Sequence, residues 1–172
     1  MKNTKNKIIT IVTGLVLSLG AFAKTSGTLD AKVRHELLML PYLSLFDDLS
    51  YRVDGSTVTL FGEVTEPVLK SDAENVVKRI EGVTAVKSQI EVLPLSPMDN
   101  QIRWRTYRAI FGYGPLQRYA LGALPSIHIV VKNGNVALKG TVANEMDKQL
   151  AYMRANAVPG VFSVTNDLQI AR

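Results

Sequence analysis

Apolar and polar positions follow the same order in two parts of this chain. Val53 to Val92 aligns without a gap on Val131 to Ile170, which lies 78 positions further on, and ten of the forty aligned positions are identical. The identities fall almost entirely on aliphatic residues, alanine and glycine, whereas most charged positions differ. A shared backbone constrains apolar and glycine positions most, so the pattern predicts two copies of one small module.

Each copy contains a predicted β-hairpin. Apolar residues alternate with polar ones on both sides of a short turn, which is Asp54-Gly55-Ser56 in the first copy and Asn133-Gly134 in the second. A period of two around a glycine-containing turn is typical of two antiparallel strands. The alternating positions are Leu49, Tyr51, Val53, Val58, Leu60 and Val64, and then Ile127, Ile129, Val131, Val136, Leu138 and Val142.

A helix and a third strand are predicted after each hairpin. Thr65 and Asn144 stand at the expected N-cap, and apolar residues then recur every three or four positions. Gly82 and Gly160 offer the left-handed conformation that ends a helix, and alternating apolar residues resume after them. Strand, helix and strand in this order usually pair the strands in parallel through a right-handed crossover.

Helical spacing also precedes each hairpin, over residues 29–40 and 100–111. The fold class is therefore predicted as α+β, with two tandem α-β-β-α-β modules over residues 24–95 and 96–172. Each module is expected to be a three-stranded mixed sheet covered by two helices. Gly62 and Gly140 lie inside predicted strands, where a glycine weakens the strand unless another segment packs against it. A closely approaching helix is the expected neighbour, and a ligand contact is the alternative.

The first 23 residues have the pattern of a secretory signal. Lys2, Lys5 and Lys7 precede an apolar run from Ile8 to Leu19, which is shorter than the roughly 20 residues of a membrane-spanning helix. Ala21-Phe22-Ala23 supplies small residues for cleavage, so we expect a mature chain that begins at Lys24. The chain has no cysteine, and its modules must be held by packed cores without disulfides.

Charge is divided unevenly between the copies. Residues 24–99 carry eight basic and twelve acidic side chains, and residues 100–172 carry nine basic and three acidic ones. The first copy is thus acidic and the second basic, with net charges of −4 and +6. No Asp or Glu lies between Asp99 and Glu145, and this stretch is predicted to attract an anionic surface.

Two glycine-containing patterns resemble the BON domain family of bacterial envelope proteins. In the first copy they are Leu60-Phe61-Gly62-Glu63-Val64 and Gly82-Val83 leading to Val86. The second copy repeats them from Leu138 to Val142 and from Gly160 to Val164, so the resemblance covers nearly all of the predicted mature chain. It implies an α/β sandwich, phospholipid binding and a link with osmotic stress. Gly62, Gly82, Gly140 and Gly160 are the predicted structural glycines, from their positions in the strands and turns. Together with the signal pattern, the resemblance implies a periplasmic location, with cleavage after Ala23.

The candidate site lies at the start of the second copy, where arginines alternate with aromatic residues. On a helix, Ile102, Thr106, Ala109 and Tyr113 form one stripe that packs on the sheet, and Trp104, Tyr107 and Phe111 form another. If the first stripe faces the core, the second faces outward at the headgroup level of a bilayer. The alternative is that the aromatics take part in ordinary core packing or in packing between the modules. The predicted lipid-binding residues are Arg103, Trp104, Arg105, Tyr107, Arg108, Phe111, Arg118 and Tyr119.

The first function hypothesis is peripheral binding to anionic phospholipid through the second module. The second is a protein-interaction or assembly module, in which the acidic copy of one molecule meets the basic copy of another. No nucleic-acid ligand is expected, because export would separate the chain from it. His35 and His128 have no cysteine or carboxylate at ligand spacing, and Asp47-Asp48 is interpreted as a solvated turn or cap. We therefore expect no enzyme, no cofactor and no metal.

Overall fold

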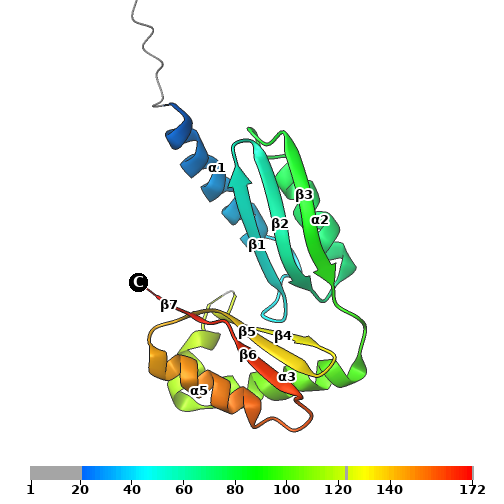
Figure 1. Cartoon of the computed structure of the whole chain (residues 1–172), viewed down its shortest axis with the longest axis vertical. Helices are drawn as coiled ribbons and strands as arrows, with labels where there is room; N and C mark the ends of the chain where they lie inside the picture. Colours follow the sequence, from blue (N-terminus) through cyan, green and yellow to red (C-terminus); the bar gives the residue numbers. More distant parts are fainter. Residues whose placement is uncertain (1–20, 123, 172) are drawn as a thin grey trace, which may run out of the picture.

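The computed structural model describes residues 21–122 and 124–171. Residues 1–20, which hold most of the predicted signal, lie outside the described residues. The chain forms two α+β modules, one above the other in Figure 1. No helix in the described part of the chain is both long enough and apolar enough to cross a membrane.

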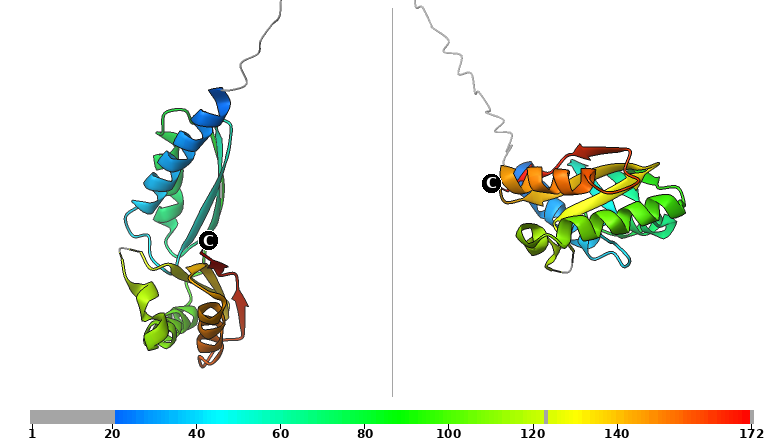
Figure 2. Two further views of the ribbon diagram at one scale, coloured as in Figure 1. Left: turned by 90° about the vertical axis from the view of Figure 1, so that its left-hand side faces the viewer. Right: turned by 90° about the horizontal axis from the view of Figure 1, so that it is seen from below.

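The first module has the predicted α-β-β-α-β order. Its strands form a sheet in the order β1-β2-β3, with β1 antiparallel and β3 parallel to β2. Both helices cover the same face of this sheet (Figure 2). The elements are α1 (Ala21–Leu38), β1 (Asp48–Asp54), β2 (Thr57–Val64), α2 (Pro67–Lys78) and β3 (Ala85–Val92).

The second module repeats this order with additions. Strand β4 is antiparallel to β5, and both β6 and β7 pair with β5 in parallel. The predicted third strand is therefore split into two short strands around Asp167 and Leu168, where the Asp167 amide still donates to the Leu138 carbonyl. The elements are α3 (Pro97–Phe111), α4 (Gly114–Gln117), the 3-10 helix η1 (Arg118–Ala120), β4 (Ile127–Lys132), β5 (Asn135–Val142), α5 (Glu145–Asn156), β6 (Ser163–Asn166) and β7 (Gln169–Ile170).

The structure confirms the repeat and the fold class. Strands β2 and β5, and helices α2 and α5, have the same bounds once 78 positions are added. The register agrees as well, since Val58 lies opposite Val86 and Val136 lies opposite Val164. Two separate cores result, one around Leu60 and Leu69 and the other around Ile102, Leu138 and neighbouring residues.

Two local predictions need correction. Asn144 is the N-cap of α5 and accepts a hydrogen bond from the Asp147 amide, as predicted, but the N-cap of α2 is Glu66 rather than Thr65. Thr65 instead donates to Asp47. Helices α2 and α5 have Arg79 and Ala157 as their C-caps, so Gly82 and Gly160 lie three residues later, in the turn toward the next strand.

The strand glycines have a neighbour other than the expected helix. A Cβ atom on Gly62 would lie 1.9 Å from the carbonyl oxygen of Asp48, and one on Gly140 would lie 2.1 Å from that of Ser126. Both glycines also have left-handed φ angles, +123° and +105°, which side chains disfavour. The backbone at the start of the preceding strand, and not a helix, therefore requires glycine at these two positions.

Candidate functional site

Helix α3 carries most of the predicted site, and its first turn is well anchored. Ser96 is the N-cap and accepts a hydrogen bond from the Asp99 amide. The buried Asp99 carboxylate in turn accepts hydrogen bonds from the amides of Asn133 and Gly134, at 2.9 and 2.8 Å. Asn133 and Gly134 both have positive φ angles, as the tightest hairpin turns require. Asp99 therefore ties α3 to the turn between β4 and β5.

The two predicted stripes of α3 are only partly separate. Ile102 and Thr106 are fully buried against the sheet, as expected. In the second stripe Trp104 is 46% exposed, Tyr107 is half-buried and Phe111 is buried in the core. The stripe thus starts at the surface and enters the protein toward the end of the helix.

Arg103 is buried, although it was predicted to face a membrane. Its side chain is 6% exposed, and Nη2 donates to the carbonyl oxygen of Val131 at 2.9 Å. Burial lowers the pKa of Arg103, while the nearby carboxylates of Asp99 and Asp47 oppose that shift. Arg103 therefore links α3 to β4 and does not lie on the outer face of the helix.

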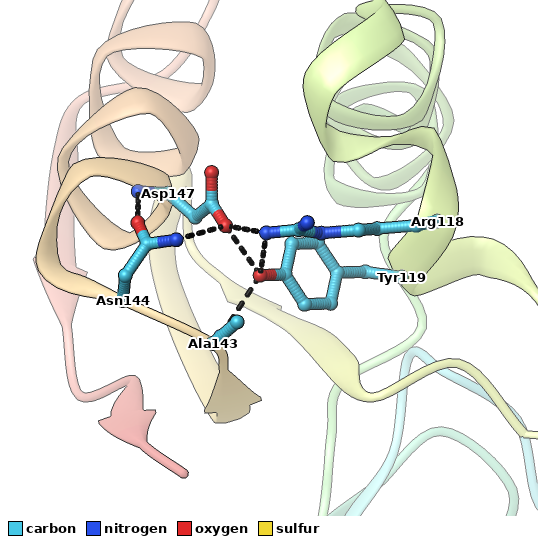
Figure 3. A network of polar contacts seen from close by, with 5 residues as sticks. All are labelled: Arg118, Tyr119, Ala143, Asn144 and Asp147. Atoms are coloured by element: carbon cyan, nitrogen blue, oxygen red, sulfur yellow. Dashed lines mark hydrogen bonds and ion pairs between the residues drawn. The ribbon is translucent and has the colours of Figure 1, made fainter.

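Arg118 and Tyr119 take part in a polar network at the start of α5 (Figure 3). The Tyr119 hydroxyl donates to the Asp147 carboxylate at 2.5 Å and accepts from the Ala143 amide at 2.8 Å. Arg118 forms an ion pair with the same carboxylate. Burial alone would raise the pKa of Asp147, but the bonds from Tyr119 and Arg118 outweigh it, so the pKa is lowered. The network fastens η1 to α5.

Two cations remain on the outer face of α3. Arg105 and Arg108 are exposed, and Arg108 lies one turn after Trp104. Arg105 donates to the carbonyl oxygen of Pro159 at 3.2 Å and to Gln101 at 3.4 Å, both uncharged acceptors. Trp104, Arg105 and Arg108 are thus all exposed on α3, and the Tyr107 ring contacts that of Trp104. The structure places Arg103, Phe111 and Tyr119 inside and Arg118 in the network with Asp147.

The junction between the modules is built around Phe46, which the sequence reasoning did not identify, although inter-module packing was its alternative for the aromatic residues of α3. Phe46, from the loop between α1 and β1, is buried in the core of the second module. Its ring meets Trp104 edge to face, with centroids 5.0 Å apart. The rings of Tyr107 and Phe111 continue this contact along α3. The Leu45 carbonyl also accepts a hydrogen bond from the Ile129 amide at 2.8 Å.

Asp47 and Asp48 hold this junction, so their interpretation as a solvated turn was wrong. Asp47 is fully buried, and its carboxylate accepts hydrogen bonds from the amide and hydroxyl groups of Ser44 and Thr65. Its carbonyl oxygen lies 2.6 Å from Nδ1 of His128. A buried carboxylate of this kind needs several donors, and the loop supplies them.

Lys139 joins the modules by charge. Its ammonium group lies 2.9 Å from the Asp48 carboxylate and 2.8 Å from that of Glu63. Burial alone would lower the pKa of Lys139, but the bonds to Glu63 and Asp48 outweigh it and the pKa is raised. A further pair, Lys132 with Glu91, is exposed. The acidic first module and the basic second module therefore meet within one molecule.

A groove of about 520 Å³ opens beside this junction. Its size is typical of ligand sites, which are mostly apolar with a few polar groups. Among the residues that the structure describes, no three His, Asp or Glu side chains are placed to hold a metal ion. The groove is lined by Phe46, Thr65, Glu66, Pro94, Leu95, Ser96, Pro97, Asn100, Arg103 and Trp104.

The fold and this surface define a tandem protein of two small α+β modules joined by a packed junction. A family model described as BON domain matches residues 25–94 and 118–172. The chain belongs to the BON domain family. Helix α3 lies between the two matched ranges.

Similar proteins were found in sequence and in structure. Osmotically-inducible protein Y of Escherichia coli (strain K12) is 32% identical over 133 residues, which cover 71% of this chain and 61% of that protein. The C-terminal domain of CdsD, a structural protein of the type III secretion system of Chlamydia trachomatis, is 10% identical with a TM-score of 0.34, covering 84% of this chain and 98% of that one. A second structure of CdsD is 13% identical with a TM-score of 0.33, covering 84% and 94%.

Proposed function

We propose that this protein is exported to the periplasm and binds anionic phospholipid reversibly through its second module. Membership of the BON domain family supports a role in the cell envelope, and the signal pattern of residues 1–23 supports export. The similarity to osmotically-inducible protein Y supports a link with osmotic stress. The chain spans 61% of that relative, so its role under stress is part of the proposal.

One observation carries the proposal. Trp104 is exposed on α3, and two exposed arginines follow it on the same helix, Arg105 directly and Arg108 one turn later. Tryptophan rings favour the headgroup level of a bilayer, and guanidinium groups pair well with phosphate. The second module is also the basic one, so its field favours an anionic surface.

The charges of α3 alone are too weak to give useful binding. A basic residue near an anionic membrane contributes about 1 kcal/mol, so Arg105 and Arg108 together contribute about 2 kcal/mol. A millimolar Kd requires about 4 kcal/mol. Because Phe111 and Tyr119 are buried in the protein core, the missing energy must come from Trp104 and from apolar groups near it.

The test uses the fluorescence of Trp104, which is the chain's single tryptophan. We expect its emission to shift to the blue when phosphatidylglycerol vesicles are added to residues 24–172. Arg105→Glu combined with Arg108→Glu should abolish the shift at moderate salt. Lys32→Glu with Lys87→Glu, two exposed positions of the first module, changes the net charge equally and should leave the shift in place. An unshifted emission in the unaltered protein would exclude the proposal.

Assembly through opposite charges remains the second hypothesis, and the junction offers an argument against it. Asp48, Glu63 and Glu91 already pair with lysines of the same molecule. These acids are therefore not available to a second copy while the junction is closed.

A further inference from the structure

The groove beside the junction has an apolar rim that includes the linker between the modules. Leu95, in that linker, is 95% exposed, and the exposed Trp104 of α3 lines the same groove. The buried Phe46 lines this groove as well. An exposed leucine and an exposed tryptophan that line one groove give the kind of apolar surface that marks a contact site.

A second hollow of about 500 Å³ continues the rim onto the first module. Thr65 and Glu66 line both hollows, so the two are adjacent. The second one is bordered by Tyr42, which is 76% exposed, and by Val68, which is also exposed. Exposed apolar side chains from both modules and from the linker therefore follow one another across the junction.

Tyr42 is exposed and lies in a loop that several hydrogen bonds hold in place. Its φ angle is +68°, a left-handed conformation that is uncommon for a bulky aromatic residue and needs support from its surroundings. That support is present, because Asp47 binds Ser44 and Thr65 while Phe46 fills the second core. The loop that carries Tyr42 is thus fixed to both modules.

The charges around this rim favour an anionic surface as its occupant. The acids of the first module that lie nearest the junction are occupied, Asp47 by hydrogen bonds and Asp48 and Glu63 by Lys139. Among the described residues that line either hollow, Glu66 is the one carboxylate. Beyond Trp104, α3 presents Arg105 and Arg108.

We infer that the surface that contacts the bilayer is composite, and that Tyr42 of the first module and Leu95 of the linker enter the headgroup region together with Trp104. This inference rests on the proposed function. Binding of a peripheral protein to a membrane grows with buried apolar area and with attraction to anionic lipid. The composite surface supplies apolar area that the second module alone lacks, and it requires the packed junction to hold its two parts in one plane.

The test places a single tryptophan at a different position of the proposed surface in each variant. Tyr42→Trp and Leu95→Trp are each made in a Trp104→Phe background of residues 24–172. With phosphatidylglycerol vesicles we expect a blue shift and quenching by brominated lipid at both positions. Phe162→Trp in the same background is the control, because Phe162 is exposed but lines neither hollow, and it should show neither effect.

A second measurement compares the affinities of serine variants for phosphatidylglycerol vesicles. Tyr42→Ser and Leu95→Ser should each weaken vesicle binding several-fold without changing the thermal midpoint, whereas Phe162→Ser should not weaken it. If Trp104 responds to vesicles but positions 42 and 95 do not, the composite surface is wrong and the proposed function stands. If Trp104 itself does not respond, the proposed function fails and the inference fails with it.

Discussion

Phe46 of the first module packs edge to face against Trp104 of the second, with ring centroids 5.0 Å apart and planes at 77°. This pair joins a buried anchor to an exposed surface residue. The anchor fixes the two modules, and the partner belongs to the proposed lipid-binding face. The junction and the candidate site therefore share residues, and a substitution in one should alter the other.

Replacing Phe46 by alanine should destabilise the second module more than the first. Removing a buried phenylalanine typically costs about 3 to 5 kcal/mol, and Phe46 belongs to the second core although it comes from the first module. Urea unfolding with a probe in each module would measure this. Leu95→Ala, at an exposed position, should change stability by less than about 0.5 kcal/mol. Equal loss in both modules would contradict the assignment of Phe46 to the second core.

Asp99→Ala should loosen the turn between β4 and β5. The Asp99 carboxylate accepts hydrogen bonds from the Asn133 and Gly134 amides, and leaving such groups unpaired costs about 1 to 3 kcal/mol. Amide hydrogen exchange at positions 133 and 134 should accelerate together with this loss. Asp167→Ala, at an exposed position, serves as the matched control. Unchanged exchange at the turn in Asp99→Ala would show that the carboxylate is dispensable there.

Acid should weaken the network around Asp147. The pKa of Asp147 is lowered in the folded protein, relative to about 3.9 in an unfolded chain. Its contribution to stability is therefore fully present above about pH 4 and is lost as the pH falls through the lower folded pKa. The urea midpoint, followed as the pH is lowered through this window, should fall less steeply in Asp147→Asn than in the unaltered chain. Identical slopes for the two proteins would remove Asp147 as a cause of acid sensitivity.

Gly140→Ala should be strongly destabilising. A Cβ atom at this position would meet the Ser126 carbonyl oxygen at 2.1 Å, and the φ angle is +105°. A strained backbone of this kind costs about 1 to 3 kcal/mol, and the clash adds to it. Gly62→Ala should behave alike, because Asp48 makes the same approach in the first copy. Gly114→Ala, where a Cβ meets open space, should leave the thermal midpoint nearly unchanged.

Most of the fold could be predicted because the sequence repeats. The order of strands and helices followed from local periodicity, and comparing Val58 with Val136 placed the two copies in register. Phe46 was beyond reach, because it lies in a loop without periodicity and its contacts come from residues more than fifty positions away. Helical spacing likewise predicts on which side of α3 Arg103 lies. It does not predict how much of the circumference of α3 is buried, and Arg103 lies within the buried part.

The network around Asp147 could have been predicted from the alignment of the two copies. Asp147 aligns with Leu69, a fully buried leucine of the first copy. A carboxylate at a core position needs partners, and the residues inserted before the second hairpin, which include Arg118 and Tyr119, supply them. The same comparison would have removed these two side chains from the list of lipid contacts.

The hydrogen bond from the Ile129 amide to the Leu45 carbonyl has a consequence for solubility. Strand β4 is the outermost strand of its sheet, and such a strand presents unpaired amides on which another chain can add a strand. The loop of the first module occupies part of that rim. Since the first module is also the first to be synthesised, it stands ready to shield the later sheet from aggregation as soon as that sheet forms.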